Sequence, residues 1–213
     1  MKLTVFGATG GTGNEVVKQA LEVGHEVTSF VRDASRLSVK NEKLRIITGD
    51  VFDAVSVSAA VQGQDAVVCA LGSGQDLKKT NIRTTGTQNI IHAMKQHNIK
   101  RLVVVTAMGV GESWETLSFI NKFFFAVVLR NSRKDHEAQE AAVINSGLDW
   151  TIIRPSGLTD TPRTGKYNEG ENISARISQI SRADVADLIL KELKENKRVR
   201  KAVTITNQES IKK

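Results

Sequence analysis

The stretch Gly7-Ala8-Thr9-Gly10-Gly11-Thr12-Gly13 decides the fold, because it joins a run typical of a β-strand to a segment of helical period. A glycine motif in that context indicates a phosphate-binding turn. We expect Gly7 to permit a tight turn, Gly10 to let the backbone approach a pyrophosphate, and Gly13 to let the helix pack closely on the strand. Free N–H groups at the helix start would face the anion. The alternative is a glycine-rich turn without a ligand.

Short β-branched runs alternate with longer helical segments along the rest of the chain. The predicted strands are Lys2–Phe6, Glu26–Val31, Leu44–Thr48, Asp65–Ala70, Arg101–Val105, Trp150–Arg154 and Ala202–Thr206. The predicted helices are Gly11–Val23, Val55–Val61, Lys79–His97, Asp135–Ser146 and Ala183–Leu193. This alternation predicts an α/β fold of the Rossmann type, a doubly wound parallel β-sheet with helices on both faces. We expect one NAD(P)-binding domain over residues 1–213.

The regular winding ends near Pro155 and Pro162, the two prolines of the chain. Residues from about 156 to 179 are rich in Gly, Thr, Asn and Arg, which predicts an irregular segment on the substrate side of the domain. In an open α/β sheet the ligand crevice lies at the carboxyl ends of the strands, where this segment begins.

Composition narrows the classes of partner. Lysine and arginine outnumber aspartate and glutamate 30 to 23, a formal charge of +7. These cations show neither a recognition-helix pattern nor interleaved aromatics, so we expect no nucleic-acid partner and assign positive charge near the cleft to an anionic cofactor.

The longest apolar patch, Phe119 to Leu129, is too short to span a bilayer, so no membrane partner is expected. It would form a wall over a substrate, a core helix or a dimer contact, which leaves monomer and homodimer open.

Cysteine and histidine usage points to a cytoplasmic protein without a metal. Cys69 is the single cysteine and lies in an apolar run, and no signal peptide precedes the first strand. The four histidines show no metal-ligand spacing with cysteine or with paired acids.

The glycine spacing is GxxGxxG, and Gly-Ala-Thr-Gly-x-Thr-Gly resembles the fingerprint of extended and atypical short-chain dehydrogenases/reductases. Within these, the chain resembles the NmrA-like and biliverdin-IXβ reductase (flavin reductase)-like family. The matching segments include Val31-Arg32-Asp33, Gly49-Asp50-Val51, Gly63-Gln64-Asp65-Ala66-Val67, Ser146-Gly147-Leu148 and Ile180-Ser181-Arg182-Ala183-Asp184. The resemblance implies a bound dinucleotide, NADP(H), whose pyrophosphate lies over Gly7, Thr9, Gly10, Gly11, Thr12 and Gly13.

The end of the second strand selects the dinucleotide. An NAD enzyme typically places an acid there on the ribose 2′-hydroxyl, whereas an NADP enzyme supplies arginine for the 2′-phosphate. Here Arg32 is followed four residues later by Arg36, and one helical turn would bring both guanidiniums to the phosphate. NADP(H) is therefore preferred, although Asp33 leaves room for NAD and an exposed Arg-Asp turn is the alternative.

Two further segments are assigned to the cofactor. Asp50 and Val51 resemble the segment that borders the adenine ring, and the Asp50 carboxylate is suited to accept from the exocyclic amine. Asp50 would equally serve as a helix cap. After the fourth strand, Leu71 and Gly72 are expected beneath the pyrophosphate and the nicotinamide ribose.

The usual chemistry of short-chain dehydrogenases is missing. Most of them protonate the product with a tyrosine whose pKa is lowered by a lysine four residues on. Tyr167, the only tyrosine, has no lysine at that spacing. Thr106 is followed by Ala107, where the family's flavin reductase has a serine. Reversible alcohol–ketone chemistry is therefore not expected.

Two functions remain open. The first is an NADPH-dependent reductase that passes a hydride to a small-molecule acceptor that is itself an electron sink: a flavin, a tetrapyrrole or a quinone. The second is a non-catalytic NADP(H)-binding sensor or regulator of the NmrA-like kind. A site without an obvious acid is expected under both.

In the reductase, Thr106, His136 and Ser156 would border the nicotinamide and the acceptor as catalytic residues. His136 would be the titrating group, although a histidine at a helix start is often only a surface or capping residue. The resemblance also implies that Ala107, Pro155 and Ser156 contact the nicotinamide end of the cofactor.

Overall fold

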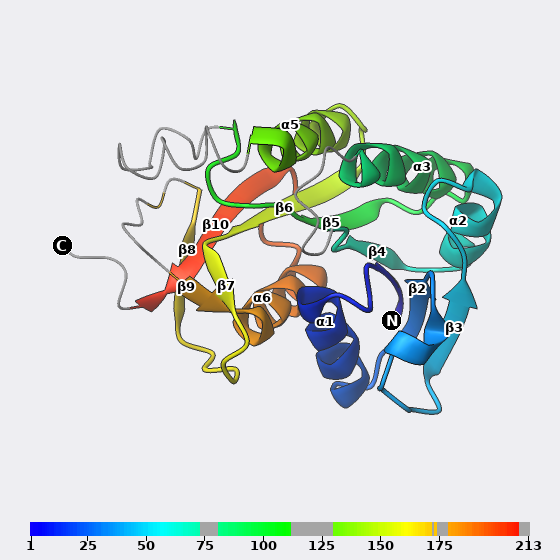
Figure 1. Ribbon diagram of the computed structural model, residues 1–213, viewed down its shortest axis with the longest axis horizontal. Coiled ribbons are helices and arrows are strands. Elements are labelled where there is room, and N and C mark those ends of the chain that lie inside the picture. The colour runs from blue at the N-terminus through cyan, green and yellow to red at the C-terminus, as the bar shows by residue number, and fades with distance from the viewer. Residues whose placement is uncertain (73–80, 112–129, 172, 174–178, 209–213) are drawn as a thin grey trace.

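The computed structural model of the protein describes residues 1–72, 81–111, 130–171, 173 and 179–208 (Figure 1). Its strands are β1 Lys2–Phe6, β2 Glu26–Val31, β3 Leu44–Thr48, β4 Ala66–Cys69, β5 Arg101–Val105, β6 Asp149–Pro155, β7 Gly157–Thr159, β8 Tyr167–Gly170, β9 Gln179–Ser181 and β10 Lys201–Asn207. Its α-helices are α1 Gly11–Glu22, α2 Ala54–Val61, α3 Ile82–Gln96, α5 Arg130–Ile144 and α6 Arg182–Glu195, and a 3-10 turn, η1, covers Ala34–Arg36.

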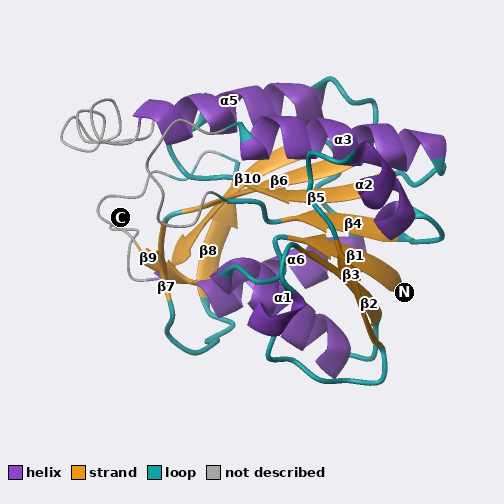
Figure 2. Ribbon diagram, turned by 45° about the vertical axis from the view of Figure 1, so that its right-hand side comes forward, coloured by secondary structure: helices purple, strands orange, loops and turns teal. Residues whose placement is uncertain are grey.

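Eight strands form one sheet in the order β3-β2-β1-β4-β5-β6-β10-β8. All neighbouring pairs are parallel except β10 with β8. Helices α1 and α6 cover one face, and α2, α3 and α5 cover the other (Figure 2). The predicted Rossmann-type doubly wound sheet in a single domain is confirmed.

Successive side chains of each strand point to opposite faces of the sheet, and helices cover both faces. The side chains on both faces are therefore apolar. Val5 of β1 packs with Val16 and Val17 of α1, while Phe6 packs on the other side with Ile90 and Met94 of α3. All six side chains are fully buried. This double burial explains why the inner strands are almost continuously apolar.

The chain reverses its direction of winding between β1 and β4, which are adjacent in the sheet. Strands β2 and β3 extend from β1 to one side, and β5, β6 and β10 extend from β4 to the other. Their connections therefore leave opposite faces and open a crevice at the carboxyl ends of the strands.

The segment predicted to be irregular, about 156–179, contains more strand than expected. Strand β8 extends the sheet by pairing antiparallel with β10, and β7 pairs with β9 in a separate two-stranded sheet. These strands are only three or four residues long. Backbone pairing with distant partners creates them, and hydrophobic alternation does not mark such short pieces.

In the part of the chain that the structure describes, no helix is long and apolar enough to cross a membrane. No group of three His, Cys, Asp or Glu side chains there is arranged to hold a metal ion. The apolar patch Phe119 to Leu129 lies outside the described residues.

Candidate dinucleotide site

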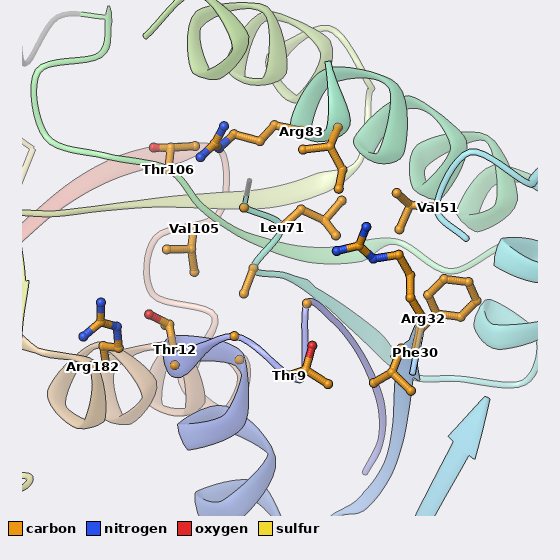
Figure 3. Close-up of a pocket in the computed structure, with 18 of the residues that line it drawn as sticks. Thr9, Thr12, Phe30, Arg32, Val51, Leu71, Arg83, Val105, Thr106 and Arg182 are labelled. Carbon is orange, nitrogen blue, oxygen red and sulfur yellow. The ribbon is translucent and has the colours of Figure 1, made fainter. Parts of the chain in front are cut away.

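A cleft of about 400 Å³ lies at the carboxyl ends of the central strands (Figure 3). Fourteen of the predicted site residues line it: Gly7, Thr9, Gly10, Gly11, Thr12, Gly13, Arg32, Arg36, Val51, Leu71, Gly72, Thr106, Ala107 and His136. Nine lining residues were not predicted: Phe30, Val31, Gly49, Ala70, Ile82, Arg83, Val105, Leu158 and Arg182. Asp50, Pro155 and Ser156 are not among the lining residues.

The turn between β1 and α1 forms one wall of the cleft. Gly7 has φ +82°, and a Cβ there would lie 2.3 Å from the Ala70 carbonyl oxygen. A Cβ at Gly13 would lie 2.2 Å from the Gly7 carbonyl oxygen. Gly10 has an ordinary φ of −80°, and its Cβ would meet only the Gly7 oxygen, at 3.2 Å. Chain packing thus requires Gly7 and Gly13, whereas Gly10 is exposed toward the cleft, where a ligand would approach it.

Helix α1 begins at this turn without a capping side chain and without an acid in its first turn. The first N–H groups of a helix have no partner within it and carry the positive end of the helix dipole. The start of α1 therefore offers an anion-binding surface to the cleft.

Arg32 and Arg36 line the cleft beside the carboxyl end of β2. The 3-10 turn η1 brings the two arginines to the same cleft, in line with the expected single turn. Asp33 begins that turn and accepts hydrogen bonds from the Ser35 amide at 3.0 Å and the Ser35 hydroxyl at 2.7 Å. These bonds lower the pKa of the Asp33 carboxyl. The Asp33 carboxylate at the end of β2 is thus already hydrogen-bonded within its own turn.

Arg182, the first residue of α6, was not predicted as a site residue. A Cβ at Gly11 would lie 2.5 Å from Arg182 Cδ, so the arginine packs directly against the glycine turn (Figure 3). Its Nη1 donates to Asp160 at 2.7 Å, and the Asp160 side chain is 84% exposed. An exposed ion pair of this kind contributes little stability, so the guanidinium is available to a stronger anion.

The adenine end was predicted to include Asp50. Its carboxylate instead accepts from the Phe52 amide at 3.0 Å in a local turn, and the residue is exposed. The alternative role as a helix cap belongs to Asp53, which accepts from the first amides of α2. Phe30, Gly49 and Val51 form the lining at this end.

Pro155 and Ser156 were predicted to contact the nicotinamide. The Pro155 carbonyl accepts from the Met108 amide at 2.9 Å. The Ser156 amide donates to Ile205 at 3.0 Å, and its hydroxyl donates to Thr206 at 3.3 Å. Both residues are therefore engaged with neighbouring backbone or with β10, and the predicted contacts receive no support from the geometry.

Thr106 lies at the end of β5 above a buried ion pair. Its hydroxyl donates to Glu140 Oε1 at 2.7 Å. The guanidinium of Arg154 donates to the same carboxylate from Nε at 3.0 Å and from Nη2 at 2.6 Å. All three residues are buried. Because the Thr106 proton points to Glu140, the hydroxyl can offer only a lone pair to the cleft.

His136 lies in the second turn of α5, because that helix begins at Arg130 and not at the predicted Asp135. It is 9% exposed and is neither a surface residue nor a cap. Burial first, and then the Arg83 charge, lower the pKa of His136 to about 4. The expectation that it titrates near neutrality is wrong, since the imidazole is neutral at pH 7.

A buried hydrogen-bond chain holds the His136 ring. Its Nδ1 lies 3.3 Å from Gln139 Oε1, and the Gln139 amide donates to Thr87 Oγ1 at 3.0 Å. With this amide orientation Gln139 Oε1 accepts, so His136 carries its proton on Nδ1. The ring is therefore fixed beside the cleft.

Arg83 is a second lining residue that was not predicted. It stands in the first turn of α3 and lies across the cleft from Thr9 and Thr12 (Figure 3). Its Nη1 lies 3.4 Å from Asp135 Oδ2. The Asp135 carboxylate also accepts from the backbone amides of Arg83 and Thr84, so α5 caps α3.

Tyr167 has a lysine partner from outside its own element. Lys191 Nζ lies 2.9 Å from the hydroxyl, which donates to Asp187 at 2.7 Å. Burial and the Asp187 carboxylate raise the pKa of Tyr167. A tyrosine acid would need the opposite change, and Tyr167 does not line the cleft.

The family model described as NAD(P)H-binding matches residues 7–196. The chain belongs to this NAD(P)H-binding family. The uncharacterized protein YwnB of Bacillus subtilis is 30% identical, over 98% of this chain and 99% of its own. ChuY of Escherichia coli, described as an anaerobillin reductase, is 26% identical over 100% of both chains, with a TM-score of 0.83. A Veillonella parvula short-chain dehydrogenase/reductase solved with NADP shares the fold at 18% identity, with a TM-score of 0.85 over 98% of this chain and 95% of its own.

The cleft fits the cofactor of the NAD(P)H-binding family. Its described lining contains arginines 32, 36, 83 and 182 and no aspartate or glutamate, which suits a ligand with several phosphates. The open start of α1 and Arg182 would hold the pyrophosphate, while small residues such as Gly72 allow close approach. The bound dinucleotide supplies hydride chemistry, and the chain binds, orients and shields it.

Proposed function

We propose that the protein is an NADPH-dependent reductase that transfers a hydride to a conjugated acceptor such as a flavin, a tetrapyrrole or a quinone. The observation that carries the proposal is a cleft in which dinucleotide-binding features adjoin lining residues that, in the described part of the chain, include no ready proton donor. The hydroxyl hydrogen of Thr106 is used in its hydrogen bond to Glu140, and the His136 imidazole is neutral. A conjugated acceptor takes up the electron pair without a protein acid in the hydride step, so stacking and exclusion of water suffice.

The preference for NADPH rests on Arg32 and Arg36, which lie beside an Asp33 carboxylate that is already hydrogen-bonded to Ser35. Two guanidiniums form charge-assisted hydrogen bonds with a 2′-phosphate. Because Asp33 already accepts two bonds from Ser35, it is less suited to bind a ribose 2′-hydroxyl. The reductase activity in the description of ChuY, which matches the full length of this chain, is consistent with the proposal.

At the nicotinamide end the chain would orient the ring rather than transfer a proton. The free lone pair of Thr106 would accept from the carboxamide N–H, and the buried Glu140–Arg154 pair would fix the Thr106 rotamer. Without this support the hydroxyl would rotate among its staggered positions.

The test is oxidation of NADPH by the purified protein, followed at the nicotinamide absorbance with FMN, FAD, a biliverdin and a quinone in turn. We expect turnover with at least one of them. Tyr167→Phe is the matched control, because it changes an ionisable residue outside the cleft and should keep the wild-type rate. Tight NADPH binding without turnover by any acceptor would refute the reductase and favour the NADP(H)-binding sensor.

A further inference from the structure

The nicotinamide contact proposed above uses Thr106 and leaves His136 without a role. Both side chains line the cleft, and both contact residues of α5. A direct hydride transfer needs the two reacting rings stacked against each other. A side chain beside the nicotinamide is therefore also beside the acceptor, so the ring of His136 is placed to contact it.

One edge of the His136 imidazole is turned into the protein. Its Nδ1 lies 3.3 Å from Oε1 of Gln139, which is fully buried. The Gln139 amide donates to Thr87 Oγ1 at 3.0 Å and approaches Cys69 Sγ at 3.8 Å, so Oε1 is left to accept from Nδ1. The two ring nitrogens point in nearly opposite directions, and Nε2 therefore points away from Gln139.

The Nε2 atom of His136 is open to the cleft. In the described part of the chain it has no hydrogen-bond partner, and it is not among the buried polar atoms that lack one. The residue is only 9% exposed, so the cleft that it lines is where Nε2 reaches solvent. Since burial keeps the imidazole neutral, Nε2 offers a lone pair and no proton.

We infer that Nε2 of His136 accepts a hydrogen bond from an N–H group of the acceptor and selects acceptors that carry such a group. A molecule that covers Nε2 with a carbonyl oxygen or a C–H leaves the lone pair buried without a donor, which costs more than the bond itself contributes. Flavins carry an imide N–H and linear tetrapyrroles carry lactam and pyrrole N–H groups, whereas simple quinones carry none. That the bound molecule is reduced rests on the proposed function, but its need for an N–H does not.

Two matched pairs of probes test the inference. Lumiflavin and 3-methyllumiflavin differ by a methyl group on the imide nitrogen, and biliverdin is compared with a biliverdin methylated on both lactam nitrogens. Their affinities are measured with NADP⁺-loaded protein, where no turnover occurs. The loss of a buried hydrogen bond predicts that the N–H member of at least one pair binds about tenfold tighter.

His136→Phe separates the hydrogen bond from the bulk of the added methyl group, because a phenyl ring fills a similar space and has no in-plane lone pair. The variant should weaken the N–H member of the discriminating pair about tenfold and bring the ratio within that pair close to one. His92→Phe, at an exposed position of α3, is the matched control and should keep the wild-type ratio.

Nitrogen NMR of the ¹⁵N-histidine-labelled wild type carries the test if His136→Phe does not fold, as judged by thermal unfolding. The resonance of His136, identified by its loss in His136→Gln, should show an unprotonated Nε2 at pH 7. It should move upfield when the N–H member of the discriminating pair binds, because Nε2 then accepts a hydrogen bond. It should not move in this way with the methylated member.

Equal affinities within both pairs, a ratio that persists in His136→Phe, or no binding of any of the four probes would overturn the inference, even if NADPH is oxidised with another acceptor. A static Nε2 resonance on binding of the N–H members would do the same. Discrimination that disappears in His136→Phe, without any turnover, would support the inference and overturn only the proposed reductase activity.

Discussion

The buried histidine beside the cleft makes a quantitative prediction about stability. His136 has an ordinary pKa of 6.5 in the unfolded chain and about 4 in the folded protein. Between these values the unfolded state binds more protons, so stability is full above the unfolded pKa and is lost as pH falls toward the folded pKa. The difference between 6.5 and about 4, at 1.36 kcal/mol per pKa unit, corresponds to about 3 kcal/mol.

The assay is urea unfolding of the wild type and of His136→Gln at a series of pH values. Between about pH 7.5 and 4.5 the wild type should lose roughly 2 to 3 kcal/mol more than the variant, because glutamine cannot take up the proton. His92→Gln, at an exposed position of α3, is the matched control and should follow the wild-type curve. Parallel curves for the wild type and His136→Gln would refute the assignment of a neutral, desolvated imidazole.

Four further substitutions test the rest of the site. Arg32→Ala should raise the Kd for NADPH about tenfold more than that for NADH, since it removes a charge-assisted contact to the 2′-phosphate, and an equal loss of both in a titration would count against that role. Gly10→Val should abolish binding of both dinucleotides while the protein still unfolds cooperatively, whereas Gly13→Ala should destabilise the fold itself because of the 2.2 Å approach to Gly7 oxygen. Glu140→Gln should cost about 3 kcal/mol or more in urea unfolding, because it leaves Arg154 buried without its carboxylate, and a loss below about 1 kcal/mol would contradict the buried ion pair.

The phosphate-binding half of the cleft could be predicted because it is built from residues that lie close together in the sequence. The spacing within Gly7 to Gly13 fixes a turn, and the turn fixes the start of α1. The same holds for Arg32 and Arg36, which lie four residues apart at the end of β2 and both line the cleft. Strands β1, β2, β3 and β5 match their predicted bounds, since parallel strands are recognisable as short apolar or β-branched runs.

Other parts depend on contacts that a single sequence does not reveal. Asp50 follows β3 as the resemblance requires, yet its own turn takes up the carboxylate. Strand β8 exists because β10 offers it an unpaired edge. Arg182 directly precedes the predicted helix Ala183–Leu193, but only the packing of α6 beside α1 carries its side chain over Gly11. The helical period of a sequence predicts which face of a helix is buried. It does not predict which other element the start of the helix contacts.

This division explains why the cofactor was easier to predict than the acceptor. A dinucleotide has a constant shape, so a contiguous motif is enough to recognise it. The opposite wall of the cleft combines Arg83 of α3, Thr106 after β5 and His136 of α5, which lie up to 53 residues apart in the chain. All three contact partners on α5: Arg83 contacts Asp135, Thr106 contacts Glu140 and His136 contacts Gln139. Helix α5 therefore orients this wall, which borders both the nicotinamide and the proposed acceptor, and we expect differences along α5 to change the acceptor while the dinucleotide stays the same.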